Sequence, residues 1–185
     1  MDSKKIGIFV GSLRRASYSL SIAKACSSLA PGELSMSFVD IGNLPIYNQD
    51  FDDEGNPPES YVQFRDEVAK LDGFLFVTPE YNRSVPAVLK NALDVGSRPY
   101  GHNVWNGKPG GIISVSPGAI GAFGANHQLR QPMVVLNVLL LQQPEAYIGR
   151  VSTLLNDKGE LTDEATISYL KSYMEAFAKW IDTVS

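Results

Sequence analysis

The stretch GSLRRASYS, residues 11–19, gives the clearest indication of fold and ligand in the sequence. It follows an apolar run from Ile6 to Val10 and precedes a helix-like pattern that begins near Tyr18. A strand, a short glycine- and serine-rich turn and a helix N-terminus together favour a phosphate, because the helix end offers free N–H donors and a partial positive charge. The same pattern would also suit a plain turn and helix cap, but the strand–turn–helix context favours phosphate binding. Further donors are the hydroxyls of Ser12, Ser17 and Ser19 and the guanidinium groups of Arg14 and Arg15.

Length, charge and composition are those of an ordinary globular protein. The chain has 185 residues, of which 44% are hydrophobic and 19% are charged, and we expect one domain over residues 1–185. The net charge of -4 favours neither nucleic acid nor an anionic membrane surface as a partner. The longest apolar run, Met133 to Leu141, is interrupted by Asn137 and is too short to span a bilayer.

Two features favour a cytoplasmic location. Residues 1–5 lead into the apolar run at Ile6 and then Gly11, which is typical of a first strand rather than a signal peptide. The only cysteine, Cys26, excludes an intramolecular disulfide and fits a reducing compartment. Cys26 falls on the apolar face of the first expected helix, which indicates a small core residue rather than a redox thiol.

Apolar periodicity predicts strands that alternate with helices. We expect strands at residues 4–10, 34–41, 73–77 and 110–115, and a short fifth strand within 138–148 that is interrupted near Pro144. The expected helices cover residues 18–29, begin after Pro57-Pro58, begin after a cap at Ser84, cover roughly 121–136 with a kink or break at Pro132, and begin after a cap at Thr162. This alternation implies a doubly wound parallel sheet that is covered on both faces.

The expected fold predicts where a ligand would bind. In doubly wound folds, ligands lie beyond the carboxyl ends of the strands, where the strand order reverses. The loops at this edge after strands one, three and four are residues 11–19, 78–84 and 116–121, and all three have unusual polar and glycine content. We therefore expect one site built from these three loops.

Three motifs in this order resemble those of the NADPH-dependent FMN reductase family. They are GSLR at 11–14 with Ser17, PEYN at 79–82, and SPGAIG at 116–121. The resemblance runs from about Lys4 to Ile181. It implies a flavodoxin-like fold with a five-stranded parallel sheet in the order 2-1-3-4-5 and helices on both faces.

The resemblance also implies how FMN is bound. The residues that match the phosphate ligands are Ser12, Arg14, Ser17 and Ser19, the last at a position where the family often has asparagine. The residues that match the segment along the isoalloxazine ring are Pro79, Glu80, Tyr81 and Asn82. Ser116 and Gly118 match the loop on the other side of the ring. The sequence departs from the family's pattern directly after this loop, where Ala122 stands at a position at which many relatives carry a second glycine.

The function implied by the resemblance is that of an FMN-dependent NAD(P)H oxidoreductase. Hydride would pass from NAD(P)H to flavin N5, and a ping-pong second half-reaction would reduce quinones or similar small acceptors, including azo compounds, chromate or free flavin. Because the flavin carries the chemistry, we expect no catalytic side chain. The sequence has only two histidines and no ligand spacing typical of a metal site.

Several alternatives stay open from the sequence. A flavodoxin-like electron carrier would bind FMN without oxidising NAD(P)H itself, although two arginines in the first loop and a modest net charge favour the enzyme. Arg15 and Arg83 lean toward NADPH, but the choice between NADPH and NADH is open, as is whether FMN stays bound or is released as a product. The resemblance implies a homodimer or homotetramer, with no nucleic-acid or membrane partner.

Overall fold

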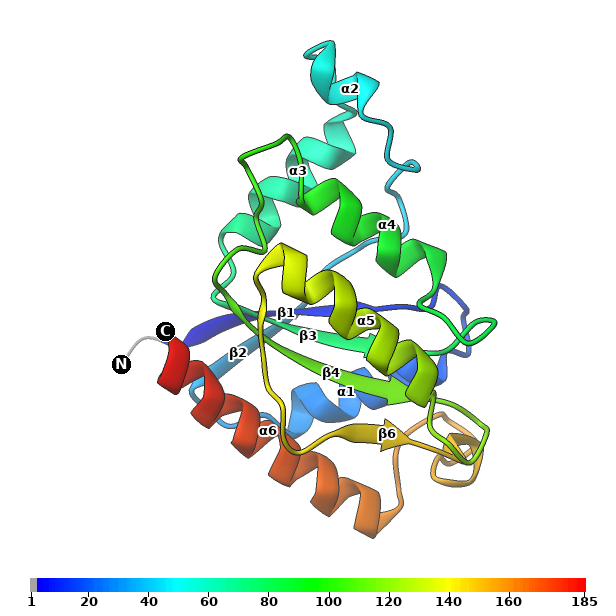
Figure 1. Cartoon of the computed structure of the whole chain (residues 1–185). Helices are drawn as coiled ribbons and strands as arrows, with labels where there is room; N and C mark the ends of the chain where they lie inside the picture. The colour runs from blue at the N-terminus through cyan, green and yellow to red at the C-terminus, as the bar shows by residue number, and fades with distance from the viewer. Residues whose placement is uncertain (1–2) are drawn as a thin grey trace.

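A parallel sheet forms the centre of the molecule in the computed structural model, which describes residues 3–185 (Figure 1). The order of its strands is β2-β1-β3-β4-β5, and β6 pairs with β4. This confirms the expected strand order and the flavodoxin-like fold. Met1 and Asp2, part of the segment expected to lead into the first strand, lie outside the described residues. The strands are β1 (Lys4–Val10), β2 (Leu34–Phe38), β3 (Gly73–Thr78), β4 (Pro109–Val115), β5 (Leu139–Leu140) and β6 (Ala146–Ile148).

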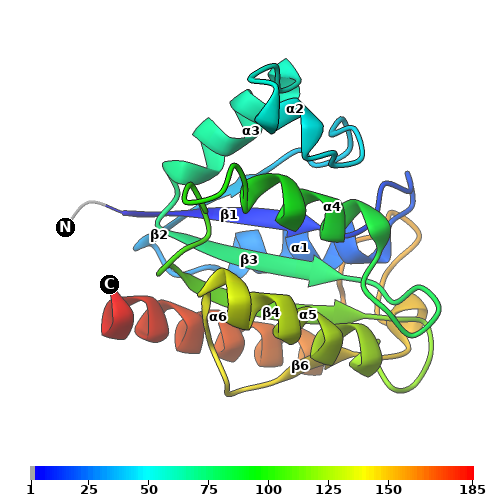
Figure 2. The same cartoon turned by 45° about the horizontal axis from the view of Figure 1, so that its top comes forward.

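The helices cover the sheet in two layers (Figures 1 and 2). One core cluster packs α1 (Tyr18–Leu29) and α6 (Glu164–Val184) against one face of the sheet. The other cluster packs the remaining long helices against the opposite face. Every residue of β3 and β4 is buried, as expected for central strands covered on both sides. The helices of the second layer are α3 (Glu59–Ala69), α4 (Ala87–Gly96) and α5 (Phe123–Leu136).

Two expected helix caps are wrong. The N-cap of α4 is Pro86, which makes no side-chain cap hydrogen bond, whereas the Ser84 amide and carbonyl pair with Tyr81 in a turn. The N-cap of α6 is Asp163, not Thr162, and its carboxylate accepts the Thr166 N–H at 2.8 Å. A carboxylate caps a positive helix end at least as well as a hydroxyl, so the neighbouring acid takes this position.

The edges of the predicted elements also shift. β2 ends at Phe38, although the Val39 N–H still bonds to the Ile8 carbonyl at 3.0 Å. The fifth strand, predicted with an interruption near Pro144, consists of the two short strands β5 and β6. α5 begins at Phe123 and continues through Pro132 to Leu136 without the break that this proline suggested. No helix within residues 3–185 is long and apolar enough to cross a bilayer.

A buried ion pair fastens the loop between β2 and α3. This loop contains the short helix α2 (Asp50–Asp53). Both terminal guanidinium nitrogens of Arg65 lie 2.8 Å from the Asp52 carboxylate oxygens, and Arg65 Nε donates to the Val95 carbonyl at 2.9 Å. The Tyr47 hydroxyl donates to the same carboxylate at 3.1 Å. These bonds, above all those from Arg65, hold the pKa of Asp52 below its usual value.

Asp52→Asn is expected to lower the free energy of unfolding by roughly 1–2 kcal/mol near neutral pH, because one charged hydrogen-bond acceptor is lost while one oxygen remains. A lowered pKa in the folded state means that the carboxylate stabilises the protein above its unfolded pKa of about 3.9 and loses this effect as the pH falls through the folded pKa. Urea unfolding at several pH values should therefore show the difference between the two proteins shrink below about pH 4. A difference that is constant with pH would contradict this role.

Candidate functional site

Three loops meet at the carboxyl edge of the sheet, where β1, β3 and β4 end (Figure 2). We call residues 11–17 the first loop, residues 79–86 the second loop and residues 116–122 the third loop. The first loop is joined to β3 by the Gly11 N–H, which donates to the Val77 carbonyl at 2.9 Å. A Cβ on Gly11 would lie 3.1 Å from Pro79 Cδ, so the first two loops touch where they leave the sheet. The structure therefore brings together the segments that the sequence assigned to one site.

The first loop ends in a capped helix. Ser17 is the N-cap of α1, and its Oγ accepts the Leu20 N–H at 3.1 Å. The Arg14 guanidinium lies 5.9 Å from the centre of the Tyr18 ring and donates a long bond of 3.4 Å to the Ala16 carbonyl. Within residues 3–185, Arg14 forms no ion pair with a carboxylate. Its charge is therefore free to meet an anion at the N-terminus of α1.

Ser19 gives a second indication of an anion. It lies in the first turn of α1 and is 1% exposed. Its Oγ is the one buried side-chain oxygen or nitrogen in the described part of the chain without a hydrogen-bond partner. A buried hydroxyl without a partner is unfavourable, because it loses its bonds to water and gains none. An oxyanion at this helix end fits the donors that are present.

A cavity of about 410 Å³ separates the first loop from the second. Ser12 and Arg14 line one side, and Tyr81, which is 49% exposed, lines the other. Its remaining walls come from the start of α4 and from two residues of the first loop. The full lining is Gly11, Ser12, Leu13, Arg14, Tyr81, Pro86, Ala87 and Val88. The structure thus brings Ser12, Arg14 and Tyr81 to one cavity.

The second loop contains a tight, strained turn. The Tyr81 N–H donates to the Ser84 carbonyl at 3.1 Å, and the Ser84 N–H donates to the Tyr81 carbonyl at 2.9 Å. The two residues between them, Asn82 and Arg83, have φ of 50° and 64°. Positive φ at both central positions is the type I′ arrangement, which glycine and asparagine usually occupy. An arginine in this left-handed conformation strains the backbone, and residues with strained backbones are found preferentially at functional sites.

The third loop is braced by the chain that follows β6. The Ser116 N–H donates to the Ile148 carbonyl at 2.9 Å, and the Arg150 N–H donates to the Gly118 carbonyl at 3.1 Å. Within the loop, Ser116 Oγ accepts the Gly118 N–H at 3.0 Å. Gly149 packs so closely that an added Cβ would overlap the Ala119 carbonyl oxygen. Residues 148–151 therefore set the position of the third loop, and the sequence offered only the glycine as a sign of this.

The departure at Ala122 has a conformational explanation. Gly121 and Ala122 both lie in the left-handed region, with φ of 59° and 60°. A second glycine would adopt this conformation without strain, whereas alanine is held there at a cost of about 1–2 kcal/mol. Ala122 is 1% exposed, so burial of its methyl group offsets part of that cost.

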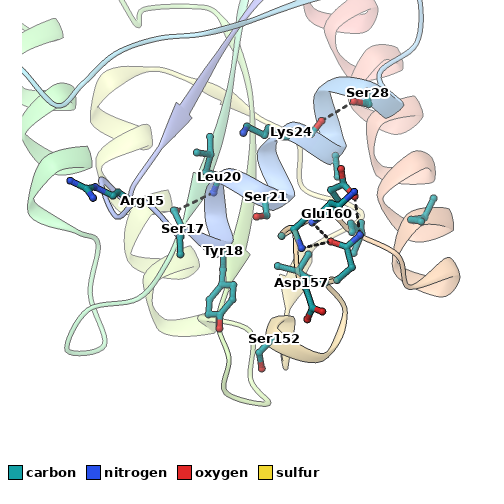
Figure 3. A pocket seen from close by; sticks show the side chains of 18 of the residues that line it. Arg15, Ser17, Tyr18, Leu20, Ser21, Lys24, Ser28, Ser152, Asp157 and Glu160 are labelled. Atoms are coloured by element: carbon teal, nitrogen blue, oxygen red, sulfur yellow. Dashed lines mark hydrogen bonds between the residues drawn. The ribbon is translucent and has the colours of Figure 1, made fainter.

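The remaining predicted residues lie apart from the cavity of the first two loops. Ser17 lines a separate groove of about 970 Å³ between α1 and residues 152–161, together with Arg15 (Figure 3). Ser116 and Gly118 lie in the third loop, and Asn82 is exposed at the tip of the second. The carboxylate of Glu80 is engaged within the protein, as described below. No group of three or more possible metal ligands occurs within residues 3–185.

Outside the loops, Cys26 lies in the core as expected, and His127 lies on the surface. Cys26 is fully buried, and burial raises the pKa of its thiol to about 12, so it is a core residue. His127 lies exposed on α5, with Nε2 2.9 Å from the Tyr147 hydroxyl.

The fold and the loops define the class of protein, and comparisons with known proteins identify the family within that class. A parallel sheet in the order 2-1-3-4-5, with a loop rich in serine and arginine after β1, is that of a flavodoxin-like protein. The family model for NADPH-dependent FMN reductase matches residues 4–153, and the chain belongs to this family. Family membership confirms an oxidoreductase that uses FMN with NAD(P)H as electron donor, rather than an electron carrier.

Individual relatives cover nearly the whole chain. A quinone reductase from Pseudomonas putida is 52% identical over 95% of this chain and 94% of its own. A 2-hydroxy-1,4-benzoquinone reductase from a Burkholderia species is 48% identical over 96% of each chain. Among solved structures, the flavoenzyme NAD(P)H:(acceptor) oxidoreductase FerB from Paracoccus denitrificans has a TM-score of 0.91, with 39% identity and 98% of each chain covered.

Proposed function

We propose that this FMN-dependent enzyme reduces quinones at the carboxyl edge of the sheet, in a ping-pong cycle. The observation that carries the choice of acceptor is the high identity, over nearly full length, to proteins named quinone reductase and 2-hydroxy-1,4-benzoquinone reductase. In the overall reaction, NAD(P)H and one proton convert a quinone to a quinol and leave NAD(P)⁺. The open cavity beside Tyr81 supports a site that small acceptors can enter.

We assign the FMN phosphate to the N-terminus of α1. Four observations in the first loop and at the start of α1 support this placement: the capped helix end, the unpaired Arg14 charge, the partnerless Ser19 hydroxyl and the half-buried Ser12 on the cavity wall. The second and third loops then flank the ring through the segment Pro79–Asn82 and through Ser116 and Gly118. Bound FMN supplies the hydride chemistry, taking two electrons from NAD(P)H and passing them to the acceptor.

The protein's own role is to bind the flavin, to orient its ring and to leave the ring accessible to small substrates. The third loop can approach a flat ring closely at Gly118, which carries no side chain. Tyr81, half exposed on the cavity wall, is placed to cover a ring edge. Each half of the cycle moves two electrons through the flavin and needs no protein nucleophile.

Rapid mixing and steady-state kinetics test this proposal. FMN-loaded protein mixed anaerobically with NADPH or NADH should lose the visible absorbance of its flavin, and a quinone should restore it. Among benzoquinone, an azo dye, chromate and free FMN, the quinone should show the highest kcat/KM, with parallel double-reciprocal lines. No bleaching with either nicotinamide would contradict the enzyme. A higher kcat/KM for free FMN would contradict the quinone assignment.

We further propose one domain over residues 1–185, a cytoplasmic location and a homodimer or homotetramer. Both core clusters lie against one sheet, which supports a single domain. A lone buried cysteine supports a reducing compartment. On α5, Val134 and Val135 are both more than four-fifths exposed, which supports a contact with another subunit. Analytical ultracentrifugation would test the assembly, and a monomer at micromolar concentration would contradict it.

A further inference from the structure

Helix α5 starts without a cap of its own. Its N-cap residue is Ala122, which has a left-handed backbone and no side chain able to accept a hydrogen bond. No acidic residue occurs in its first turn. The free N–H groups at a helix start need acceptors, and a negative charge there is favourable. The acceptor for α5 must therefore come from another part of the chain.

Glu80 in the second loop supplies it. Its Oε2 accepts the N–H of Ala125, in the first turn of α5, at 3.1 Å. The Glu80 side chain is only 11% exposed, so water competes little for this bond. The fit depends on Gly124, because a Cβ at that position would lie 2.8 Å from Glu80 Oε2. In both cartoon views the loop between β3 and α4 lies beside the start of α5 (Figures 1 and 2).

The other oxygen of Glu80 fastens the strained turn. Oε1 lies 3.0 Å from Arg83 Nη1, and Arg83 is one of the two residues with positive φ in that turn. Arg83 is 73% exposed, so this ion pair by itself contributes little. The carboxylate nevertheless joins the turn on one side to the start of α5 on the other.

From this geometry we infer that Glu80 is a positioning residue that fixes the spacing between the second and third loops. The inference rests on the proposed function, in which these two loops flank the flavin ring. Glu80 thus acts through the backbone that it holds, and its carboxylate is not a ligand of the cofactor. The ring, not the phosphate, should be affected when this spacing changes, because the Glu80 carboxylate is bonded to Arg83 and Ala125, which lie outside the first loop.

The test compares Glu80→Ala and Glu80→Gln by titration with FMN and with riboflavin, which lacks the phosphate. Glu80→Ala removes both bonds, and we expect the Kd of each flavin to rise about tenfold, the size of a lost helix cap. Glu80→Gln keeps an amide oxygen for the Ala125 N–H, so we expect both Kd values to stay within about threefold of the original. Asp94→Ala, which removes the exposed Lys90–Asp94 pair on α4, is the matched control and should change little.

Three outcomes of the titrations would overturn the inference. They are unchanged flavin affinity in Glu80→Ala, a loss confined to FMN, and an equal loss in Glu80→Gln. Amide hydrogen exchange at residues 123–126 gives a readout without flavin: exchange should quicken in Glu80→Ala and not in Glu80→Gln, and equal rates in all variants would also overturn it. If the unaltered protein binds neither flavin, the flavin proposal fails at that step, while the exchange rates still decide whether Glu80 holds α5.

Discussion

Gly121→Ala is expected to lower the free energy of unfolding by about 2–5 kcal/mol, because two unfavourable effects act together at this residue. Gly121 has a φ of 59°, a conformation in which alanine is strained. A Cβ there would also lie 2.6 Å from the Tyr147 carbonyl carbon and 2.9 Å from the Ile148 nitrogen. These are backbone atoms of β6 that cannot turn aside, so the third loop must move. Urea unfolding followed by circular dichroism measures the effect.

Other glycines of the chain separate the two effects. Gly55 has a φ of 69° and no atom within 4 Å of an added Cβ, so Gly55→Ala should show conformational strain alone, about 1–2 kcal/mol. Gly149 has the close contact without the positive φ, so Gly149→Ala should show the contact alone, about 1–3 kcal/mol. Gly32 has neither a positive φ nor an atom close to an added Cβ, so Gly32→Ala should leave the free energy of unfolding unchanged or raise it slightly.

Flavin binding distinguishes these variants further. Gly121→Ala and Gly149→Ala displace the third loop and should weaken the binding of FMN, whereas Gly55→Ala should leave it unchanged. If Gly121→Ala proved no more destabilising than Gly55→Ala, the close contact with β6 would be refuted.

The parts of the site that sequence predicted have a signature in residue type. Serines and arginines after a buried strand indicate an anion, and Pro79 and Gly118 mark the ends of strands, so all three loops were found. The brace at residues 148–151 has no such signature, because it consists of backbone N–H and carbonyl groups that any residue carries. The bond from Glu80 to Ala125 joins residues 45 positions apart and depends on how two loops pack.

The boundaries of the helices also could not be predicted fully from residue types. The last helix has Thr162 and Asp163 next to each other, and both are good caps, so residue preference alone could not choose between them. Of the kink or break expected at Pro132, the break does not occur, since the helix continues with neighbours that pack on the sheet, Leu129 and Met133. Packing, which sequence patterns describe only on average, decided the second case.

Arg14→Ala is expected to raise the Kd for FMN by about tenfold to 150-fold, because charged hydrogen bonds contribute about 1.5–3 kcal/mol. Arg14 is exposed and unpaired beside Ser12, on the wall of the cavity that Tyr81 closes on the other side. Removal of its charge should act on the phosphate and leave the affinity for riboflavin within about twofold, since a neutral flavin gains little from a nearby guanidinium. Fluorescence titration with both flavins measures the ratio.

Arg15→Ala is the matched control, since it removes the same charge from the same loop. Arg15 lines the groove along α1 and not the cavity, so its loss should change FMN affinity much less. Added salt should narrow the gap between the original protein and Arg14→Ala, because it screens exposed charges. Equal losses for FMN and riboflavin would refute the assignment of Arg14 to the phosphate. Equal losses for the two flavins are instead expected for Glu80→Ala. Titration with FMN and riboflavin therefore distinguishes a residue that binds the phosphate from a residue that positions the loops around the ring.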